Sequence, residues 1–354
     1  MQPDSKHASQ RGFSLVEIMV GLLIGLLSTL AVMQVFTSWE GQKRTTSAGS
    51  DAQSNGAIGL FNIERDVRMA GYGIGVTDAL NCTVNQNYNG TSSTLSLVPV
   101  AITQGVGTLP DSITALYSSK DSFSIPARVT VNHPAEATNF FLNSTLGLAE
   151  GDLLVVWEAG KDCTLVQITG IPSGNIQIHH QSTSKWNPPG GQNIFPTGGY
   201  KIGTKLFNFG NLPTRVYSIN SATPNGGLQL ATTIHTAAGL STTTDILASD
   251  IINLQAEYGV DDGTGGTPDD GIVDTWTTIT PANLKQILAI RLAIAARSNV
   301  REKTAVTLDN GTWSGGTINL TKNADGTNNV DWQLYRYRIF ETVIPLRNMI
   351  WNLS

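Results

Sequence analysis

The feature that most constrains this chain is a run of apolar residues near its N-terminus, from Phe13 to Phe36. The only charged residue in the run is Glu17. A helix needs about 20 apolar residues to cross the hydrocarbon core of a bilayer, whereas a helix packed on a protein core normally keeps a polar face. The run therefore predicts a membrane-spanning helix at the start of the chain.

The residues around the start of this run carry a processing motif. Residues 1–12 are polar, and the sequence Gly-Phe-Ser-Leu-Val-Glu runs from Gly12 to Glu17. An ordinary secretory signal is cleaved after its apolar region, at small residues. This motif instead resembles the type IV prepilin motif. The resemblance implies that a prepilin peptidase cuts between Gly12 and Phe13, that Phe13 is methylated, and that the apolar helix stays on the mature protein.

Glu17 is the residue of this segment with a predicted role in assembly. A charge in the centre of a membrane helix costs roughly 2.5–3.5 kcal/mol, and less near the interface. Buried charges persist where they find a partner. The resemblance implies that Glu17 meets the amine of Phe13 on the same or a neighbouring subunit. The simpler alternative is a glutamate whose side chain reaches the membrane surface.

Beyond the apolar run the same helix is expected to continue to about Met69, because no proline occurs between Pro3 and Pro99. Its second half is predicted to pack an apolar stripe onto the rest of the protein. The stripe consists of Ile58, Leu60, Ile63 and Val67, and the helix is expected to stop at Gly71, Gly73 and Gly75.

The remainder of the chain has the pattern of short strands between Gly, Pro and Asn turns. Predicted strands are 152–158, 164–171, 176–180, 228–234, 251–260, 288–295 and 335–344, and Thr280 and Pro281 resemble the start of a short helix. The fold class is α+β, with one long helix packed on a mainly antiparallel sheet with insertions. The predicted parts are a leader (1–12), a transmembrane half-helix (13–36), an amphipathic half-helix (37–72) and a β-rich extracytoplasmic head (73–354).

Two segments of the head are specific enough to indicate a family. Residues 65–73 read RDVRMAGYG, and residues 337–348 read YRIFETVIPLRN. Both resemble the PilW family of minor pilins, as does a stretch around residues 257–276, whereas residues 77–247 resemble nothing known. The resemblance implies a pilin-like fold and a minor pilin that helps to initiate and assemble type IV pili, with its head near the pilus tip. The alternatives are an adhesin-like binding module at the tip and a J-type pseudopilin of a type II secretion system.

The same resemblance implies where the chain acts and with what. The expected partners are prepilin peptidase, other minor pilins, the major pilin, the inner-membrane assembly platform, the membrane itself through residues 13–36, and a tip adhesin. The expected location is the bacterial inner membrane with the head in the periplasm, and then the pilus on the cell surface. The net charge of −5 and the lack of a Lys/Arg run give no reason to expect nucleic acid.

Cys82 and Cys163 are the two cysteines, and they lie too far apart for a CxxC metal or redox motif. In an oxidising compartment they are expected to form a disulfide. The alternative is two free buried thiols.

A stretch rich in aspartate, from Asp261 to Asp274, is the one candidate for a ligand-binding site. Calcium prefers hard oxygen ligands, and the alternative is a plain turn, since Asp-Gly is a common hairpin signal. No other cofactor and no enzymatic constellation is expected. The candidate metal ligands are Asp261, Asp262, Asp269, Asp270 and Asp274.

Overall fold

The computed structural model describes residues 12–74, 77–120, 125–174, 176–189, 194–222, 226–236 and 239–350. Its first element is helix α1 (Leu15–Met69), which confirms the long N-terminal helix. The chain divides within this helix into two compact units, one ending at Ser50 and one beginning at Asp51. Residues 1–11 of the predicted leader lie outside the described residues.

Helix α1 ends where the chain takes up a left-handed backbone. Gly71 has a φ of +78° and donates its N–H to the carbonyl of Leu116. Gly73 has a φ of +93°, and a Cβ atom there would lie 2.6 Å from the Cβ atom of Ser118. Both the conformation and the space at this turn therefore require glycine. Gly75, the third predicted stop, lies outside the described residues.

The part of α1 that follows Asp51 buries one face. Ile63 and Val67 of the predicted stripe are fully buried, but Ile58 is 50% exposed, so its assignment to the stripe was wrong. Small residues form much of the contact instead, because they allow the helix backbone to approach the sheets closely. The buried positions recur every three or four residues, as one helix face requires: Ala52, Gly56, Gly59, Ile63, Val67 and Ala70.

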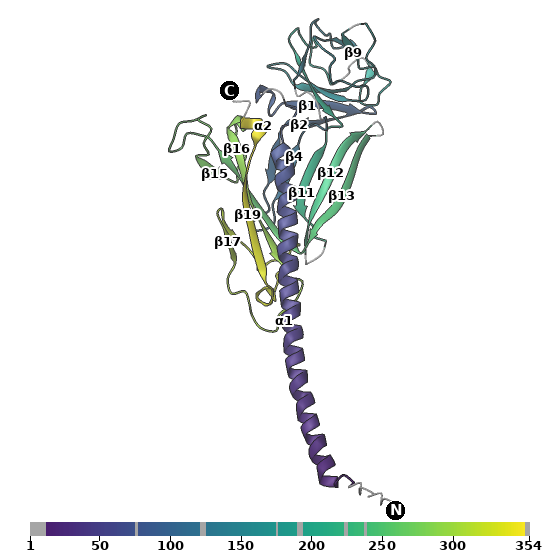
Figure 1. The fold of residues 1–354 in the computed structure, drawn as a ribbon. Helices are drawn as coiled ribbons and strands as arrows, with labels where there is room; N and C mark the ends of the chain where they lie inside the picture. Colours follow the sequence, from purple (N-terminus) through teal and green to yellow (C-terminus); the bar gives the residue numbers. More distant parts are fainter. Residues whose placement is uncertain are drawn as a thin grey trace, which may run out of the picture. The chain divides into compact units, whose positions relative to one another are not determined.

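Two antiparallel sheets flank this part of α1 (Figure 1). The five-stranded sheet has the order β13-β12-β11-β4-β3, and the four-stranded sheet has the order β15-β14-β16-β19. The strands of the first are β3 (Val100–Thr103), β4 (Ser112–Leu116), β11 (Thr214–Ile219), β12 (Gly227–Thr236) and β13 (Gly239–Ser249). Those of the second are β14 (Ile251–Val260), β15 (Thr275–Thr277), β16 (Ile287–Arg297) and β19 (Tyr337–Pro345).

Strand β16 shows why these residues form a central strand. One set of its side chains joins the core shared with α1, and the alternate set is small and faces a second, smaller core. The first set is Ile290, Leu292 and Ile294, and the second is Ala293 and Ala295. The hairpin of β17 (Gly311–Trp313) and β18 (Gly316–Ile318) contributes Ile318 to the smaller core. The predicted strand at 288–295 is therefore confirmed, with apolar cover on both faces.

A six-stranded sheet, with the order β2-β1-β8-β7-β10-β5, lies in the part of the sequence that resembled no family. It has two hydrophobic cores of its own, one around Leu153 and Phe209 and one around Phe140 and Tyr200. Its pairings are antiparallel except for β1 with β8. The strands are β1 (Thr83–Tyr88), β2 (Thr91–Ser96), β5 (Ala127–Arg128), β7 (Leu153–Trp157), β8 (Cys163–Gln167) and β10 (Lys205–Gly210), beside a two-stranded ribbon of β6 (Asn139–Phe141) and β9 (Gln177–His179).

Each predicted strand overlaps an observed one, and a short helix precedes β16 as predicted, but it starts later than expected. Thr280 and Pro281 start no helix; a 3-10 turn, η3 (Leu284–Gln286), follows them. Its N-cap is Asn283, whose side chain accepts a hydrogen bond from the N–H of Lys285. The capping role thus falls to a residue closer to β16. The other short elements are η1 (Thr77–Ala79), η4 (Trp332–Leu334) and α2 (Arg347–Ile350).

Candidate functional site

The predicted cleavage point lies in exposed chain just before α1. Phe13 is 83% exposed. A Cβ atom added to Gly12 would have no other atom within 4 Å. The peptide bond between these two residues is therefore free of steric cover by the described part of the chain.

Glu17 closes a capping box at the start of α1. The N–H of Ser14 donates to Oε2 of Glu17 at 3.4 Å, and Oγ of Ser14 accepts from the N–H of Val16 at 3.3 Å. This reciprocal pattern satisfies amides that a helix N-terminus leaves unpaired, and a carboxylate there is favoured by the helix dipole. The Ser-x-x-Glu spacing was the available signal for this role, which the sequence analysis missed.

The apolar part of α1 has the length and composition of a membrane-spanning helix. Its most apolar window has a mean hydropathy of 2.3 and none of it is buried, so α1 is long and apolar enough to cross a membrane. Cβ atoms added to Gly21 and Gly25 would meet no atom within 4 Å. These two glycines, four positions apart, are thus open to the close approach of another helix.

A buried carboxylate ties the C-terminal part of α1 to the five-stranded sheet. Asp66 is 3% exposed and accepts from Nη1 of Arg215 at 2.7 Å, from Nε of Arg65 at 3.1 Å, and from the hydroxyl of Tyr217. Burial raises the pKa of Tyr217, and the neighbouring carboxylate raises it further, so the phenol stays a donor. A buried charge held by several donors is costly to disrupt.

Asn348 joins the two segments that indicated the family. Its Nδ2 donates to the carbonyl of Met69 at 3.2 Å and to that of Ala70 at 3.1 Å. These carbonyls belong to the last turn of α1, which has no further turn to bond. Residues 65–73 and 337–348 therefore meet at one place, where the end of the chain caps the end of the helix.

Arg291 forms a second charged junction, on the face of the four-stranded sheet away from α1. It pairs with Glu257, which lies directly opposite on β14. Its guanidinium carbon lies 4.8 Å from the ring centre of Trp276 and 5.5 Å from that of Trp313. Such stacking on aromatic rings is favourable for a guanidinium, so we assign this group a structural role.

Cys82 and Cys163 form a disulfide, with their Cα atoms 5.9 Å apart. Cys163 begins β8, and Cys82 precedes β1, the parallel neighbour of β8. The predicted pairing is confirmed, and it closes a loop with a sequence separation of 81 residues.

The acidic stretch forms the connection between β14 and β15, which pair with each other. Its carboxylates accept hydrogen bonds within the loop: Asp261 from the N–H groups of Asp269 and Gly271, and Asp274 from that of Gly263. The described residues contain no group of three or more His, Cys, Asp or Glu side chains placed to hold a metal ion. Calcium binding here, through any of the five predicted aspartates, stays a prediction.

Two histidines that the sequence did not single out form a buried pair. Nε2 of His133 lies 2.9 Å from Nε2 of His180, and Phe140 stacks on His133 with ring centres 3.8 Å apart. Burial lowers the pKa of His133 to about 4 and that of His180 to about 3. Both imidazoles are therefore neutral at pH 7, one donating to the other.

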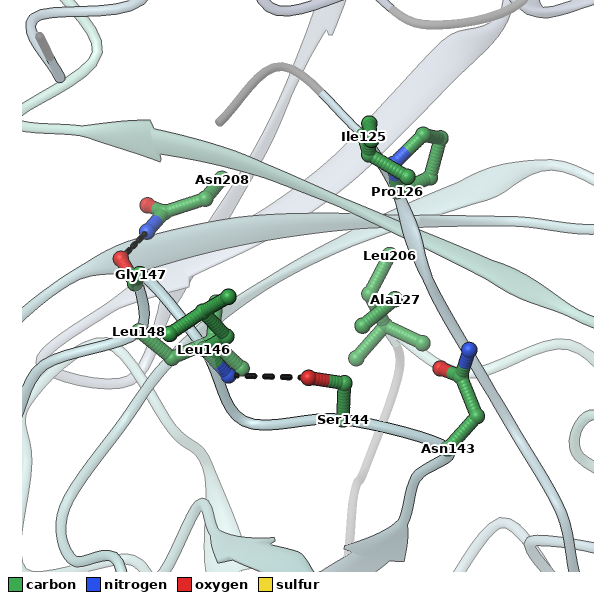
Figure 2. A pocket seen from close by; sticks show the side chains of 10 residues that line it. All are labelled: Ile125, Pro126, Ala127, Asn143, Ser144, Leu146, Gly147, Leu148, Leu206 and Asn208. Carbon is green, nitrogen blue, oxygen red and sulfur yellow. Dashed lines mark hydrogen bonds between the residues drawn. The ribbon is translucent and has the colours of Figure 1, made fainter. Parts of the chain in front are cut away.

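A pocket of about 180 Å³ lies beside β5 and β10 (Figure 2). Its lining is mostly aliphatic, and its polar groups are engaged at the rim: Ser144 accepts from the N–H of Leu146, and Asn208 donates to the carbonyl of Gly147. Among the described residues that line the pocket, none is an acid or a base. It therefore offers no catalytic arrangement.

Comparison with known proteins gives two family matches. Residues 216–348 match the family described as Type IV Pilus-assembly protein W, and residues 7–33 match the Prokaryotic N-terminal methylation motif. The first match begins well before Leu247, where the sequence analysis placed the end of the unmatched region. Neither a curated protein sequence nor a solved structure matches the chain. The resemblance stated from the sequence is confirmed by both matches.

Proposed function

We propose that this chain, a type IV pilus minor pilin by its PilW domain and its N-terminal methylation motif, takes part in the initiation and assembly of pili. Its N-terminal helix enters the fibre, and its β-rich head lies near the tip. The observation that carries the proposal is Glu17, a carboxylate at the first turn of an apolar helix that follows a prepilin motif directly.

The chemistry of this role follows from processing. Cleavage after Gly12 turns the N–H of Phe13 into a charged amine at the start of an apolar helix. An unpaired amine would be penalised in the helical core of a fibre. The carboxylate of Glu17 is the acidic group of this segment, so it can accept the amine of Phe13 on its own or a neighbouring subunit. In this arrangement only the processed chain would have both halves of the assembly contact.

The proposed partners follow from the same route. Prepilin peptidase would remove residues 1–12, and the inner membrane would hold residues 13–36 with the head in the periplasm. The assembly platform would then pass the chain into a fibre with other minor pilins and the major pilin. Binding of a tip adhesin or another ligand by the head is a second candidate function. It is favoured by the six-stranded sheet, because all strands of that sheet lie outside both family matches and the sheet has cores of its own.

The test uses a strain that lacks this chain, complemented with the wild type or with Glu17→Leu. We expect both proteins to insert into the membrane and to begin at a methylated Phe13 when the N-terminal peptide is sequenced. Only the wild type should restore pili and appear in sheared fibres. Glu17→Gln is the matched control, since it keeps the shape and the capping acceptor and removes the charge; it should fail as Glu17→Leu does.

Three results would contradict the proposal. Pili that are normal in the strain lacking the chain, with secretion lost instead, would favour the J-type pseudopilin. A mature protein that keeps Met1 would exclude prepilin processing. Normal incorporation of Glu17→Leu would show that Glu17 makes no assembly contact.

A further inference from the structure

Strand β13 ends the five-stranded sheet and pairs through one edge only. Its register with β12 runs from Gly239 opposite Thr236 to Ser249 opposite Gly227. Within the described part of the chain, no strand pairs with its other edge. An unpaired edge presents a row of free N–H and C=O groups, which is a template for pairing with another chain.

The register identifies which backbone groups face outward. The N–H of His235 donates to the carbonyl of Asn211, on the side of β12 away from β13, so His235 and Leu240 face each other without backbone hydrogen bonds. Hydrogen-bonded and non-bonded positions then alternate along the strand. Residues 241, 243 and 245 therefore bond to β12, whereas residues 240, 242, 244 and 246 direct their N–H and C=O groups outward.

From Leu240 to Ile246 this edge has one charged residue, Asp245, and the register shift of β13 comes only after Ile246. The side chains from Leu240 to Ile246 are exposed on both faces of the strand, and they include neither Pro nor Lys. The opposite edge of the same sheet is covered, since the N–H of Ile102 in β3 donates to the hydroxyl of Tyr258. Natural sheets usually shorten, charge or cover their edges, so a long uncovered edge indicates a partner.

The side chains of β13 define the chemistry of that partner. Leu240 and Ile246 are 57% and 52% exposed and lie on one face of the strand. Asp245 lies on the other face, and its carboxylate has no hydrogen-bond or ion-pair partner among the described residues. A matching strand would place apolar residues beside Leu240 and Ile246 and a basic residue beside Asp245. Leu240 and Ile246 lie roughly 20 Å apart along the strand, so such a segment needs about seven or eight residues.

We propose that β13 is a docking edge that accepts an extended strand from a different subunit of the same pilus, extending the sheet by strand addition. This inference rests on the proposed function. A second copy of β13 does not fit as the donor. The strand contains neither Lys nor Arg, so a second β13 would place no basic residue beside Asp245.

The experiment places a photo-crosslinking amino acid at Thr242 of the full chain in piliated cells. The same amino acid at Thr94 is the matched control, because β2 is also an edge strand and Thr94 faces outward by the same alternation, counted from Tyr88 and Thr91, which flank a two-residue turn. We expect a cross-link from Thr242, and none from Thr94, to another pilus subunit. The cross-linked peptide should hold alternating apolar residues and a Lys or Arg.

Two substitutions test the contact itself. Thr244→Pro removes one outward N–H and leaves the bonds to β12 in place, so it should lower the cross-link yield about tenfold, as losing roughly one net hydrogen bond would do. Thr94→Pro should leave the yield unchanged. Asp245→Lys should lower the cross-link yield more than Asp245→Asn, because lysine reverses the charge whereas asparagine only removes it. An unchanged melting temperature and an intact disulfide check that each variant folds.

The proposal is overturned if Thr242 cross-links to a second copy of this chain or to a protein outside the pilus. It is also overturned if no cross-link forms, or if the yield is insensitive to Thr244→Pro. Failure of the proposed function is a separate result, because it appears as normal pili in the strain that lacks the chain.

Discussion

At the scale of single residues, two glycines of α1 that differ only in their surroundings show how closely the helix packs. A Cβ atom at Gly56 would lie 2.1 Å from the ring of Phe340, whereas one at Gly49 would meet no atom within 4 Å. The buried stripe was predicted from large apolar residues, and Ile58 was one of them. A pattern of large apolar residues does not reveal this face of α1. Small residues are buried there because the sheets approach the helix backbone closely.

The first prediction follows from these two glycines. Gly56→Ala should lower the free energy of unfolding by about 1–2 kcal/mol, because the cost of overpacking, about 1–3 kcal/mol, exceeds the gain of about 0.5–1 kcal/mol for alanine in a helix. Gly49→Ala, the matched control, should cause no loss. Urea unfolding followed by circular dichroism measures both. Equal effects at the two positions would mean that Phe340 does not pack on Gly56.

At the scale of elements, β14 and β13 show how burial affects the prediction of a strand. Strand β14, buried along most of its length, was predicted with its observed bounds. Strand β13 was not predicted, since most of its residues are polar and exposed. Its conformation is set by pairing with β12 rather than by burial. Likewise, the meeting of Asn348 with the end of α1 depends on contacts far apart in the chain, which no local pattern contains.

The histidine pair gives the second prediction, on pH dependence. A histidine in the unfolded chain has a pKa of about 6.5, and burial lowers those of His133 and His180 to about 4 and about 3. The unfolded state thus binds more protons below pH 6.5. The stabilising contribution of the pair is complete above pH 6.5 and should be lost progressively as the pH falls to about 3.

The measurement is thermal unfolding of the purified protein between pH 7.5 and pH 3.5. Replacing both histidines with leucine should flatten the dependence on pH, because an apolar pair has nothing to titrate. His179→Gln, next to the pair in sequence, is the control and should keep the wild-type slope. Burial also lowers the pKa of His235, and its contribution to the pH dependence of stability should be the same in every variant. An unchanged slope in the double variant would place the pH dependence outside this pair.

The acidic loop between β14 and β15 gives the third prediction. If Asp261 and Asp269 ligate calcium, calcium should stabilise the folded state by mass action and raise the melting temperature. The free energy of unfolding should rise by about 2.7 kcal/mol at a calcium concentration 100 times the dissociation constant. The shift should disappear with EDTA and in the Asp261→Asn/Asp269→Asn variant. Asp325→Asn, a change in another exposed turn, should keep it. An equal shift in the loop variant would leave the stretch as a hairpin connection alone.

At the scale of the whole molecule, the head combines two parts with separate cores. The part that matches the PilW family shares its core with the last turns of α1. The six-stranded sheet and its ribbon have two others, and the disulfide lies with one of them, since Cys163 is a member of that core. The sequence predicted the cysteine pair and the α+β class. It could not predict this division, because most of the segment that builds the second part resembled nothing known.

The last prediction tests that division through the disulfide. Replacing both cysteines with serine removes a cross-link that should contribute roughly 4–5 kcal/mol by the chain-entropy estimate for a loop of this length. Because the bond joins β8 to the residue before β1, the loss should fall on the six-stranded sheet. Hydrogen exchange measured by mass spectrometry should show faster exchange in peptides from β1, β7 and β8, and little change in those from β14 and β16. Reduction of the wild type is the matched control and should give the same pattern. Uniform loss of protection would show that the head unfolds as one cooperative unit, because destabilising one part would then lower the protection of every strand equally.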